Sequence, residues 1–220
     1  MKNKSIAVIG AGKWGQALHF ALSQKQKCLI TSRTKKDIEN FVDLKTALDC
    51  EYLVIAIPAQ EIRTWLKENF VFKGQKILVA SKGIEANTGE FLNEIYSAFV
   101  PDENIGFISG PSFAAEVIKG LPCALVLNSS SKELYNEFEP FFPNFIKTYY
   151  SSDVIGAEIA GAYKNVLAIA SGICEGLNLG KNAQASLIAR GLVEMQRFGK
   201  HFGAKKSSFL GLSGAVSDSI

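Results

Sequence analysis

The sequence contains few of the residues that would indicate a disulfide framework or a metal site. It has two histidines and four widely separated cysteines, with no C-x-x-C pair: Cys28, Cys50, Cys123 and Cys174. Zinc sites and disulfide frameworks need clustered or evenly paired ligands, and this spacing provides neither. We therefore expect reduced thiols, no metal site and a cytoplasmic location.

Long apolar runs and concentrated positive charge are also missing. No apolar run approaches the ~18 residues that a membrane-spanning helix requires. The N-terminal stretch MKNKSIAVIGAGKWG has a short apolar run that ends in glycines, which suits a buried strand better than a signal peptide. The net charge is only +3, and the lysine pairs are scattered rather than gathered in a stripe. We therefore expect neither membrane insertion nor nucleic-acid binding.

Short apolar runs alternate with helical patterns through the first 150 residues. Strands are expected at 5–9, 28–31, 52–57, 76–80, 105–109 and 123–127, and helices at 13–23, 60–69, 89–99, 111–119 and 131–141. Strands that alternate with helices form a parallel sheet with helices on both faces. The pattern predicts an α/β, Rossmann-like domain with a mostly parallel sheet.

The pattern changes after residue 150. Residues 153–176 and 182–204 each read as one long helix, rich in small residues that permit close helix packing. We therefore divide the chain into a dinucleotide-binding domain, residues 1–150, and the start of an all-helical substrate or catalytic domain, residues 151–220.

A glycine-rich motif follows the first expected strand. Gly10, Gly12 and Gly15 form G-x-G-x-x-G in the stretch VIGAGKWG. The first glycine allows a tight turn, the second lets a pyrophosphate approach the backbone, and the third lets the helix pack closely on the strand. The phosphates would then lie at a helix N-terminus, which favours anions. Because the motif lies between a strand and a helix, it indicates dinucleotide binding.

The end of the second expected strand bears on the choice between NAD and NADP. NAD-binding domains usually place an acid about 20 residues after the glycine motif, to bind the ribose 2′-hydroxyl. This chain instead reads Thr31-Ser32-Arg33-Thr34, followed by two lysines. Arg33 is suited to a 2′-phosphate, so we expect NADP(H) to be accepted. The alternative is an exposed arginine with no role in cofactor binding.

One lysine lies in a helix that is otherwise small, apolar or uncharged. In GAYKNVLAIASG, residues 161–172, the neighbours of Lys164 three and four positions away include no carboxylate. A buried amine without a counter-ion has a lowered pKa and becomes a usable base. The alternative is a side chain whose amine reaches water while its stem is buried.

Several long segments resemble the bacterial NAD(P)-dependent glycerol-3-phosphate dehydrogenases. They are GAGKWGQAL (10–18), VIAIPAQ (54–60), SKGIE (81–85), SGPSFAAEV (109–117) and the stretch from GAYKNV to GLVEM (161–195). The resemblance implies an oxidoreductase that interconverts dihydroxyacetone phosphate and sn-glycerol 3-phosphate by hydride transfer with NAD or NADP. It also implies a small phosphorylated substrate and a role in supplying glycerophospholipid synthesis, and it leaves a homodimer open.

The resemblance also assigns roles to individual residues. The catalytic group comprises Lys164 as proton acceptor, its neighbour Asn165, and Lys82. The cofactor contacts are Gly10, Gly12, Lys13, Trp14, Gly15, Arg33, Pro58, Lys82 and Ala114. The substrate contacts are Lys82, Gly110, Ser112 and Lys164. Two alternatives stay open, since Lys82 could be a solvated loop lysine and Ser112 could cap the helix after Pro111.

The end of the sequence departs from the family pattern. The family continues after GLSGAGDL with an aspartate and a Ser-Arg-Asn segment, whereas this chain reads GLSGAVSDSI, and Asp218 is out of register. We therefore expect a shortened helical domain, and a catalytically impaired dinucleotide-binding fragment is the alternative function. A related dehydrogenase for another small acid or phosphate ester would leave the Lys82 and SGPSF matches unexplained.

Overall fold

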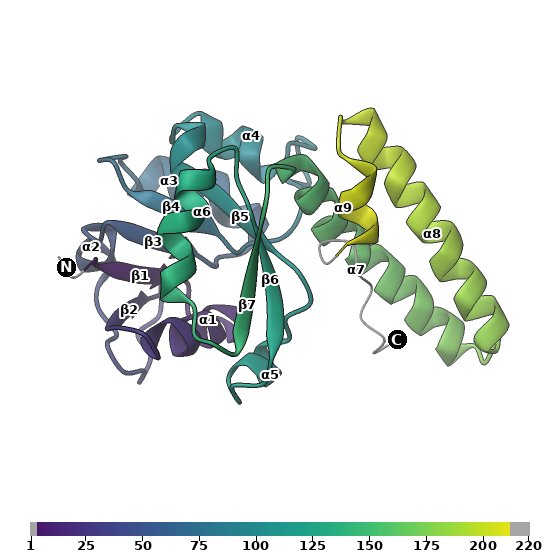
Figure 1. Ribbon diagram of the computed structural model, residues 1–220, viewed down its shortest axis with the longest axis horizontal. Coiled ribbons are helices and arrows are strands. Elements are labelled where there is room, and N and C mark those ends of the chain that lie inside the picture. Colours follow the sequence, from purple (N-terminus) through teal and green to yellow (C-terminus); the bar gives the residue numbers. More distant parts are fainter. Residues whose placement is uncertain (1–3, 212–220) are drawn as a thin grey trace.

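A seven-stranded sheet forms the larger part of the molecule, and a helical arm projects from one side of it (Figure 1). The computed structural model describes residues 4–211. The strands are β1 (Ile6–Ile9), β2 (Cys28–Thr31), β3 (Tyr52–Ile55), β4 (Lys76–Val79), β5 (Ile105–Ser109), β6 (Cys123–Asn128) and β7 (Ile146–Ser151). They lie in the order β2-β1-β3-β4-β5-β6-β7.

Helices cover both faces of the sheet, as the alternating pattern predicts. The buried residues of α1 (Lys13–Ser23), α5 (Ala114–Val117) and α6 (Lys132–Phe138) pack in one apolar core. Those of α2 (Leu44–Leu48), α3 (Ile62–Asn69) and α4 (Leu92–Ser97) pack in a second core on the other face. Short 3₁₀ turns at Ala59–Glu61, Asp102–Asn104 and Glu139–Phe141 complete the connections. The central strands are buried on both sides, which explains their uninterrupted apolar sequences.

One pair of neighbouring strands is antiparallel, in agreement with the predicted mostly parallel sheet. All neighbouring strands are parallel except β5 and β6, which are antiparallel with Ile108 opposite Leu127. A parallel crossover normally needs a full helix, and the connection here contains only the four-residue α5. The chain therefore reverses after Ser109, and the sheet is mostly rather than wholly parallel.

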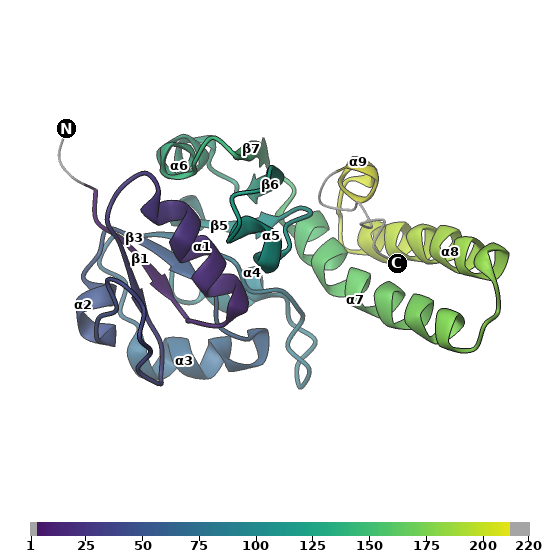
Figure 2. The same ribbon diagram turned by 90° about the horizontal axis from the view of Figure 1, so that it is seen from below.

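The helical arm is an antiparallel hairpin closed by a short third helix. Helix α7 (Val154–Gly176) runs outward, α8 (Lys181–His201) returns beside it, and α9 (Lys206–Leu210) packs against both (Figure 2). Asp153 fastens the base of the arm. Its carboxylate accepts hydrogen bonds from the N–H groups of Gly156 and Lys205, at 3.1 and 2.8 Å, and from the Ser208 hydroxyl.

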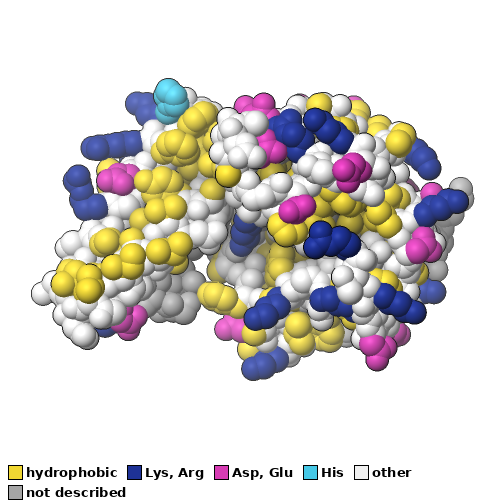
Figure 3. Space-filling model, turned by 180° about the vertical axis from the view of Figure 1, so that it is seen from behind, with side chains coloured by type: hydrophobic (Ala, Val, Ile, Leu, Met, Phe, Trp, Pro, Cys, Tyr) yellow, Lys and Arg dark blue, Asp and Glu magenta, His cyan; other side chains and the backbone are white. Residues whose placement is uncertain are grey.

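The outer part of the arm exposes apolar side chains. Val166, Ile169, Ile173 and Leu177 recur along α7 at helical spacing, and each is more than half exposed. Figure 3 shows hydrophobic side chains in a row along this lobe. Among residues 4–211, no helix has both the length and the apolar character needed to cross a membrane.

Candidate active site

The glycine motif forms the turn between β1 and α1, at the point where the strand order reverses. Strand β1 pairs with β2 on one side and β3 on the other, and open α/β sheets bind ligands at such a point. Gly10 has a φ of +108°, and its N–H donates to the Thr31 carbonyl at 2.8 Å. A Cβ at Gly10 would overlap the Ala56 carbonyl oxygen, and one at Gly15 would overlap the Gly10 carbonyl oxygen. The first and third glycines are thus required by the turn itself.

The second glycine is not required by protein packing. A Cβ at Gly12 would meet no atom within 4 Å, and the Gly12 φ of −71° is open to any residue. Gly12 is the N-cap of α1, whose first turn contains no acidic side chain. The Nε1–H group of Trp14, in that turn, is buried without a hydrogen-bond partner in the described part of the chain. Open space beside a helix N-terminus that contains no acidic side chain fits a dinucleotide pyrophosphate.

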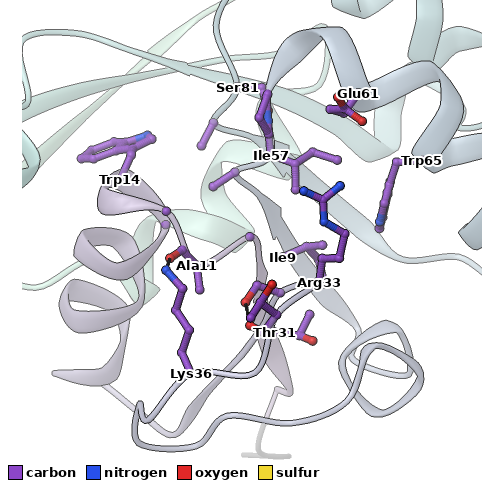
Figure 4. A pocket seen from close by; sticks show the side chains of 18 of the residues that line it. Ile9, Ala11, Trp14, Thr31, Arg33, Lys36, Ile57, Glu61, Trp65 and Ser81 are labelled. Carbon is purple, nitrogen blue, oxygen red and sulfur yellow. Dashed lines mark hydrogen bonds between the residues drawn. The ribbon is translucent and has the colours of Figure 1, made fainter.

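A groove of about 1690 Å³ runs from this turn along the carboxyl edge of the sheet. Figure 4 shows Arg33 reaching across it toward Ile57 and Trp65, while Lys36 is directed to the Ala11 carbonyl oxygen. The predicted cofactor contacts all line this groove: Gly10, Gly12, Lys13, Trp14, Gly15, Arg33, Pro58, Lys82 and Ala114.

The end of the groove that is lined by the residues after β2 is predominantly basic. Arg33 and Lys36 lie there with Lys35, and the Lys36 amine donates to the Ala11 carbonyl oxygen at 2.6 Å. Asp43 also lines the groove, but its carboxylate caps α2 by accepting from the N–H and hydroxyl of Thr46. These hydrogen bonds lower the Asp43 pKa and engage the carboxylate. The groove therefore presents cations where a 2′-phosphate would lie.

A smaller pocket adjoins the groove and contains the lysine on α7. Ser81 and Lys82 line both spaces, and the pocket is completed by residues of β5 and α7, including Gly110 and Lys164. The structure thus brings together residues 82, 110 and 164 from three separate parts of the sequence. The pocket has a volume of only about 30 Å³, so a ligand in the groove could extend no more than a small group into it, beside Lys82.

Lys164 has the electrostatic character expected of a base. Burial is the main cause that lowers the pKa of Lys164 to about 8, and the neighbouring positive charge of Lys82 lowers it further. Within residues 4–211, no carboxylate forms an ion pair with Lys164. Although part of Lys82 is exposed to the groove, desolvation around its amine lowers its pKa as well. Near neutral pH the pocket can therefore exchange a proton.

Side chains of the 3₁₀ turn Ala59–Glu61 and of α3 form hydrogen bonds and ion pairs with the segment that contains Lys82. Gln60 donates to the Ile84 carbonyl at 2.9 Å and accepts from the Ala86 N–H at 2.8 Å. Arg63 forms ion pairs with Glu85 and Glu90. The Ser81 hydroxyl donates to the Ile57 carbonyl at 2.5 Å. These contacts fix the backbone on both sides of Lys82.

The structure bears on the predicted roles of Asn165 and Ser112. Asn165 is exposed and lines neither the groove nor the pocket. Ser112 lines the groove but does not cap a helix, because α5 begins at Ala114 and its N-cap is Phe113. The Ser112 hydroxyl instead contacts the Gly110 carbonyl at 3.4 Å. The capping alternative for Ser112 is wrong.

The sequence analysis missed three polar residues of the pocket, namely Ser81, Ser109 and Glu158. Ser81 immediately precedes Lys82, and its position after an apolar strand is a usable signal. Glu158 is the least expected one, because it comes from the second turn of α7 and is only 8% exposed. Its sequence signal is an acid in the small-residue stretch GAEIAGA. In the part of the chain that is described, no three histidine, cysteine or acidic side chains converge as a metal site.

Comparison with known proteins adds independent information. Residues 23–135 match the family model described as NAD-dependent glycerol-3-phosphate dehydrogenase N-terminus, and residues 153–220 match the corresponding C-terminus model. The chain is 67% identical over 210 residues to glycerol-3-phosphate dehydrogenase [NAD(P)+] of Sulfurimonas denitrificans, and 63% identical to that of Campylobacter jejuni. Each alignment covers 96% of this chain and 71% of the relative.

Solved structures agree with the sequence matches. Glycerol-3-phosphate dehydrogenase from Coxiella burnetii superposes with a TM-score of 0.83 at 32% identity, over 96% of this chain and 73% of that one. The yeast enzyme superposes with a TM-score of 0.80 at 22% identity, covering 99% of this chain and 76% of the other, which shows the fold alone.

Proposed function

Because this chain belongs to the NAD-dependent glycerol-3-phosphate dehydrogenase family, we propose that it interconverts sn-glycerol 3-phosphate and dihydroxyacetone phosphate. The reaction converts a secondary alcohol to a ketone, so it transfers one hydride and one proton. The nicotinamide cofactor supplies the hydride chemistry when bound, and the protein must supply binding, orientation and proton transfer.

The groove at the β1–α1 turn is the proposed cofactor site. The N-terminus of α1 and the open space at Gly12 would accept the pyrophosphate. Arg33, Lys35 and Lys36 would lie near the adenosine ribose, where their charge favours a 2′-phosphate. We therefore propose that NADP(H) is accepted along with NAD(H), and that Arg33 contributes to the preference between them.

Lys164 is the proposed acid and base of the reaction. With a pKa of about 8, its amine can take the hydroxyl proton of glycerol 3-phosphate and return a proton to the ketone oxygen in the reverse direction. Burial of the amine and the nearby charge of Lys82 keep enough of the amine neutral for the first role. No carboxylate competes for that proton by pairing with Lys164 in the described part of the chain.

Lys82 is the proposed link between substrate and cofactor. It lines both the groove and the small pocket, and its amine would stabilise negative charge on the substrate phosphate or on the developing alkoxide. Gly110 would let the substrate approach the backbone, and Ser112 offers a hydroxyl at the edge of the groove. Asn165 remains a prediction from the family resemblance, because its side chain lies outside both spaces.

The juxtaposition of Lys82 and Lys164 beside the glycine turn is the observation that carries this proposal. The direct test is NADPH oxidation by the purified 220-residue chain, with and without dihydroxyacetone phosphate. We expect oxidation that depends on the substrate. Lys164→Ala should bind NADPH with unchanged affinity in a fluorescence titration and lose at least 100-fold in turnover, roughly the contribution of a positioned acid or base.

The same assay separates the competing functions. Lys200→Ala, which removes an exposed lysine of α8, is the matched control and should behave as the unaltered chain. Near-normal turnover of Lys164→Ala would contradict the assignment of the base. NADPH binding without substrate-dependent oxidation in the unaltered chain would instead show a dinucleotide-binding protein without catalysis.

The cellular setting follows from the reaction. Glycerol 3-phosphate is the backbone precursor of glycerophospholipids, so we propose a role in lipid synthesis. The four cysteines are free thiols, and we propose a cytoplasmic location, where thiols stay reduced. Sedimentation of the purified chain would test the homodimer that the family resemblance leaves open.

A further inference from the structure

Glu158 is a buried acid for which the proposed reaction has no obvious use. Its side chain lies on the second turn of α7, is 8% exposed, and lines the small pocket with Lys82 and Lys164. The Oε2 atom has no hydrogen-bond partner among the described residues. A buried polar atom without a hydrogen-bond partner costs stability. The position therefore calls for a functional reason.

The other carboxyl oxygen makes one specific contact across the molecule. Oε1 of Glu158 accepts a hydrogen bond of 3.0 Å from the backbone N–H of Asn93, in the first turn of α4. That turn has its own cap, because the Glu94 carboxylate accepts the Phe91 N–H at 2.7 Å. Glu158 thus binds an amide that α4 does not satisfy itself, and it joins the helical arm to the sheet domain.

The contact lies between the elements that carry the two lysines. Lys164 follows Glu158 by six residues on α7, or about 9 Å along the helix axis. Lys82 precedes α4 in the segment that Gln60 and Arg63 hold in place. Around this contact Phe91 packs with Ile159 and Ala160 of α7. A shift of α7 relative to α4 would therefore move Lys164 relative to Lys82.

The protonation state of Glu158 is consistent with such a role. Burial raises the pKa of Glu158 to about 8, opposed by hydrogen bonds from the first turn of α4 and supported by the charge of Glu94. The charged or titratable groups that face this region are Glu94 on α4, Lys82 after β4 and Lys164 on α7. A neutral carboxyl leaves both amines unpaired, whereas a carboxylate would attract one of them and remove it from the reaction.

We propose that Glu158 is a positioning residue, which binds the Asn93 N–H and thereby fixes Lys164 of α7 at its working distance from Lys82. The proposal rests on the proposed dehydrogenase function for its purpose, but the positioning itself is a property of the chain. Glu158 does not line the groove. Its Oε1 atom is hydrogen-bonded to the Asn93 N–H, so this oxygen acts on the position of α7 and not on the substrate.

Two substitutions separate positioning from simple packing. Glu158→Met keeps a side chain of similar length and removes the acceptor for Asn93; the loss of a buried polar group offsets part of the cost of leaving the Asn93 N–H unpaired. Glu158→Gln keeps an acceptor oxygen and is neutral, so it should retain the contact. Glu175→Met, at an exposed position on the outer part of α7, is the control.

The primary readout does not need turnover. Lys164 is labelled with acetic anhydride across pH 6–11 and quantified by mass spectrometry, with exposed Lys200 as an internal reference for the reagent. We expect Glu158→Met to move the labelling midpoint of Lys164 at least one pH unit upward, because the amine loses its fixed, desolvated place beside Lys82. Glu158→Gln and Glu175→Met should leave the midpoint unchanged.

Kinetics provide the second readout. In Glu158→Met, kcat should fall at least tenfold while NADPH affinity changes less than twofold, and Glu158→Gln should stay within about threefold of the unaltered chain. An unchanged Lys164 labelling profile in Glu158→Met would overturn the proposal, whatever the turnover. Loss of turnover in Glu158→Gln equal to that in Glu158→Met would also overturn it, since the carboxyl proton itself would then be required. A shifted profile in a chain without turnover would support positioning while contradicting the dehydrogenase function.

Discussion

The aliphatic stem of Lys82 lies against Gly161 of α7. A Cβ at Gly161 would be 3.8 Å from the Lys82 Cγ, so the stem crosses the helix one turn before Lys164. Lys82 is near enough to Lys164 for its positive charge to lower the pKa of Lys164. This contact joins the sheet domain to the arm at the proposed site of proton transfer.

The lowered pKa of Lys164 sets the expected pH dependence of the reaction. Oxidation of glycerol 3-phosphate needs the neutral amine, so its rate should rise by about tenfold per pH unit at low pH and level off above about 8. Reduction of dihydroxyacetone phosphate needs the protonated amine and should decline above about 8. Initial rates measured from pH 6 to 10 in both directions test this, and parallel profiles in the two directions would contradict it.

Removing the charge of Lys82 should change the titration of Lys164. Lys82→Met keeps the stem that packs on Gly161 and removes the positive charge, so the pKa of Lys164 should rise. It should stay below its ordinary value, because burial is the larger cause of the shift. Labelling of Lys164 as a function of pH measures this change. An unchanged or lower pKa would contradict the electrostatic effect of Lys82 on Lys164.

Gly12 should matter for cofactor binding and not for folding. Its position is open and its backbone conformation is ordinary, so Gly12→Ala should leave the urea unfolding midpoint unchanged. The added methyl group would occupy the space proposed for the pyrophosphate, and the Kd for NADPH should rise about tenfold or more, or ~1.4 kcal/mol. Gly172→Ala, also open but on the outer part of α7, is the control. Equal effects of the two substitutions would contradict the proposed cofactor position.

Gly110 should matter for folding. Its φ is +114°, and a Cβ there would lie 2.6 Å from the Ala124 carbonyl oxygen, so Gly110→Ala combines backbone strain with a steric clash. Strained backbone of this kind costs about 1–3 kcal/mol before the clash is counted. Gly89→Ala is the matched control, because Gly89 has a φ of +75° with no atom within 4 Å of the added Cβ. Urea denaturation should show the larger loss of stability for Gly110→Ala.

Local features of the fold could be predicted from the sequence. Helix α1 and strand β2 have the predicted bounds, because their apolar spacing and flanking glycine and polar residues are signals within a few positions. Strand β7 was missed, since Ile146 and Thr148 are buried while Lys147 and Tyr149 are exposed, and only continuous apolar runs were read as strands. The short helix α2, capped by Asp43, and helix α9 were missed as well.

Features that depend on distant contacts could not be predicted. The antiparallel pairing of β5 with β6 depends on how the chain turns after Gly110, which the spacing of apolar residues does not reveal. The glycine motif, Lys82 and Lys164 were identified by local pattern and family resemblance, and the fold brings them to one edge of the sheet. The contact of Glu158 with Asn93 joins residues 65 positions apart, and neither residue carries a local signal of its partner.

The attachment of the helical arm has a mechanical consequence. Asp153 and α9 hold the arm at its base, whereas its tip at Leu177–Gly180 is exposed. Bending of the arm about its base would therefore displace its tip further than its root. Lys164 lies on the inner half of α7, so such bending would displace its amine less than the outer turns of the helix.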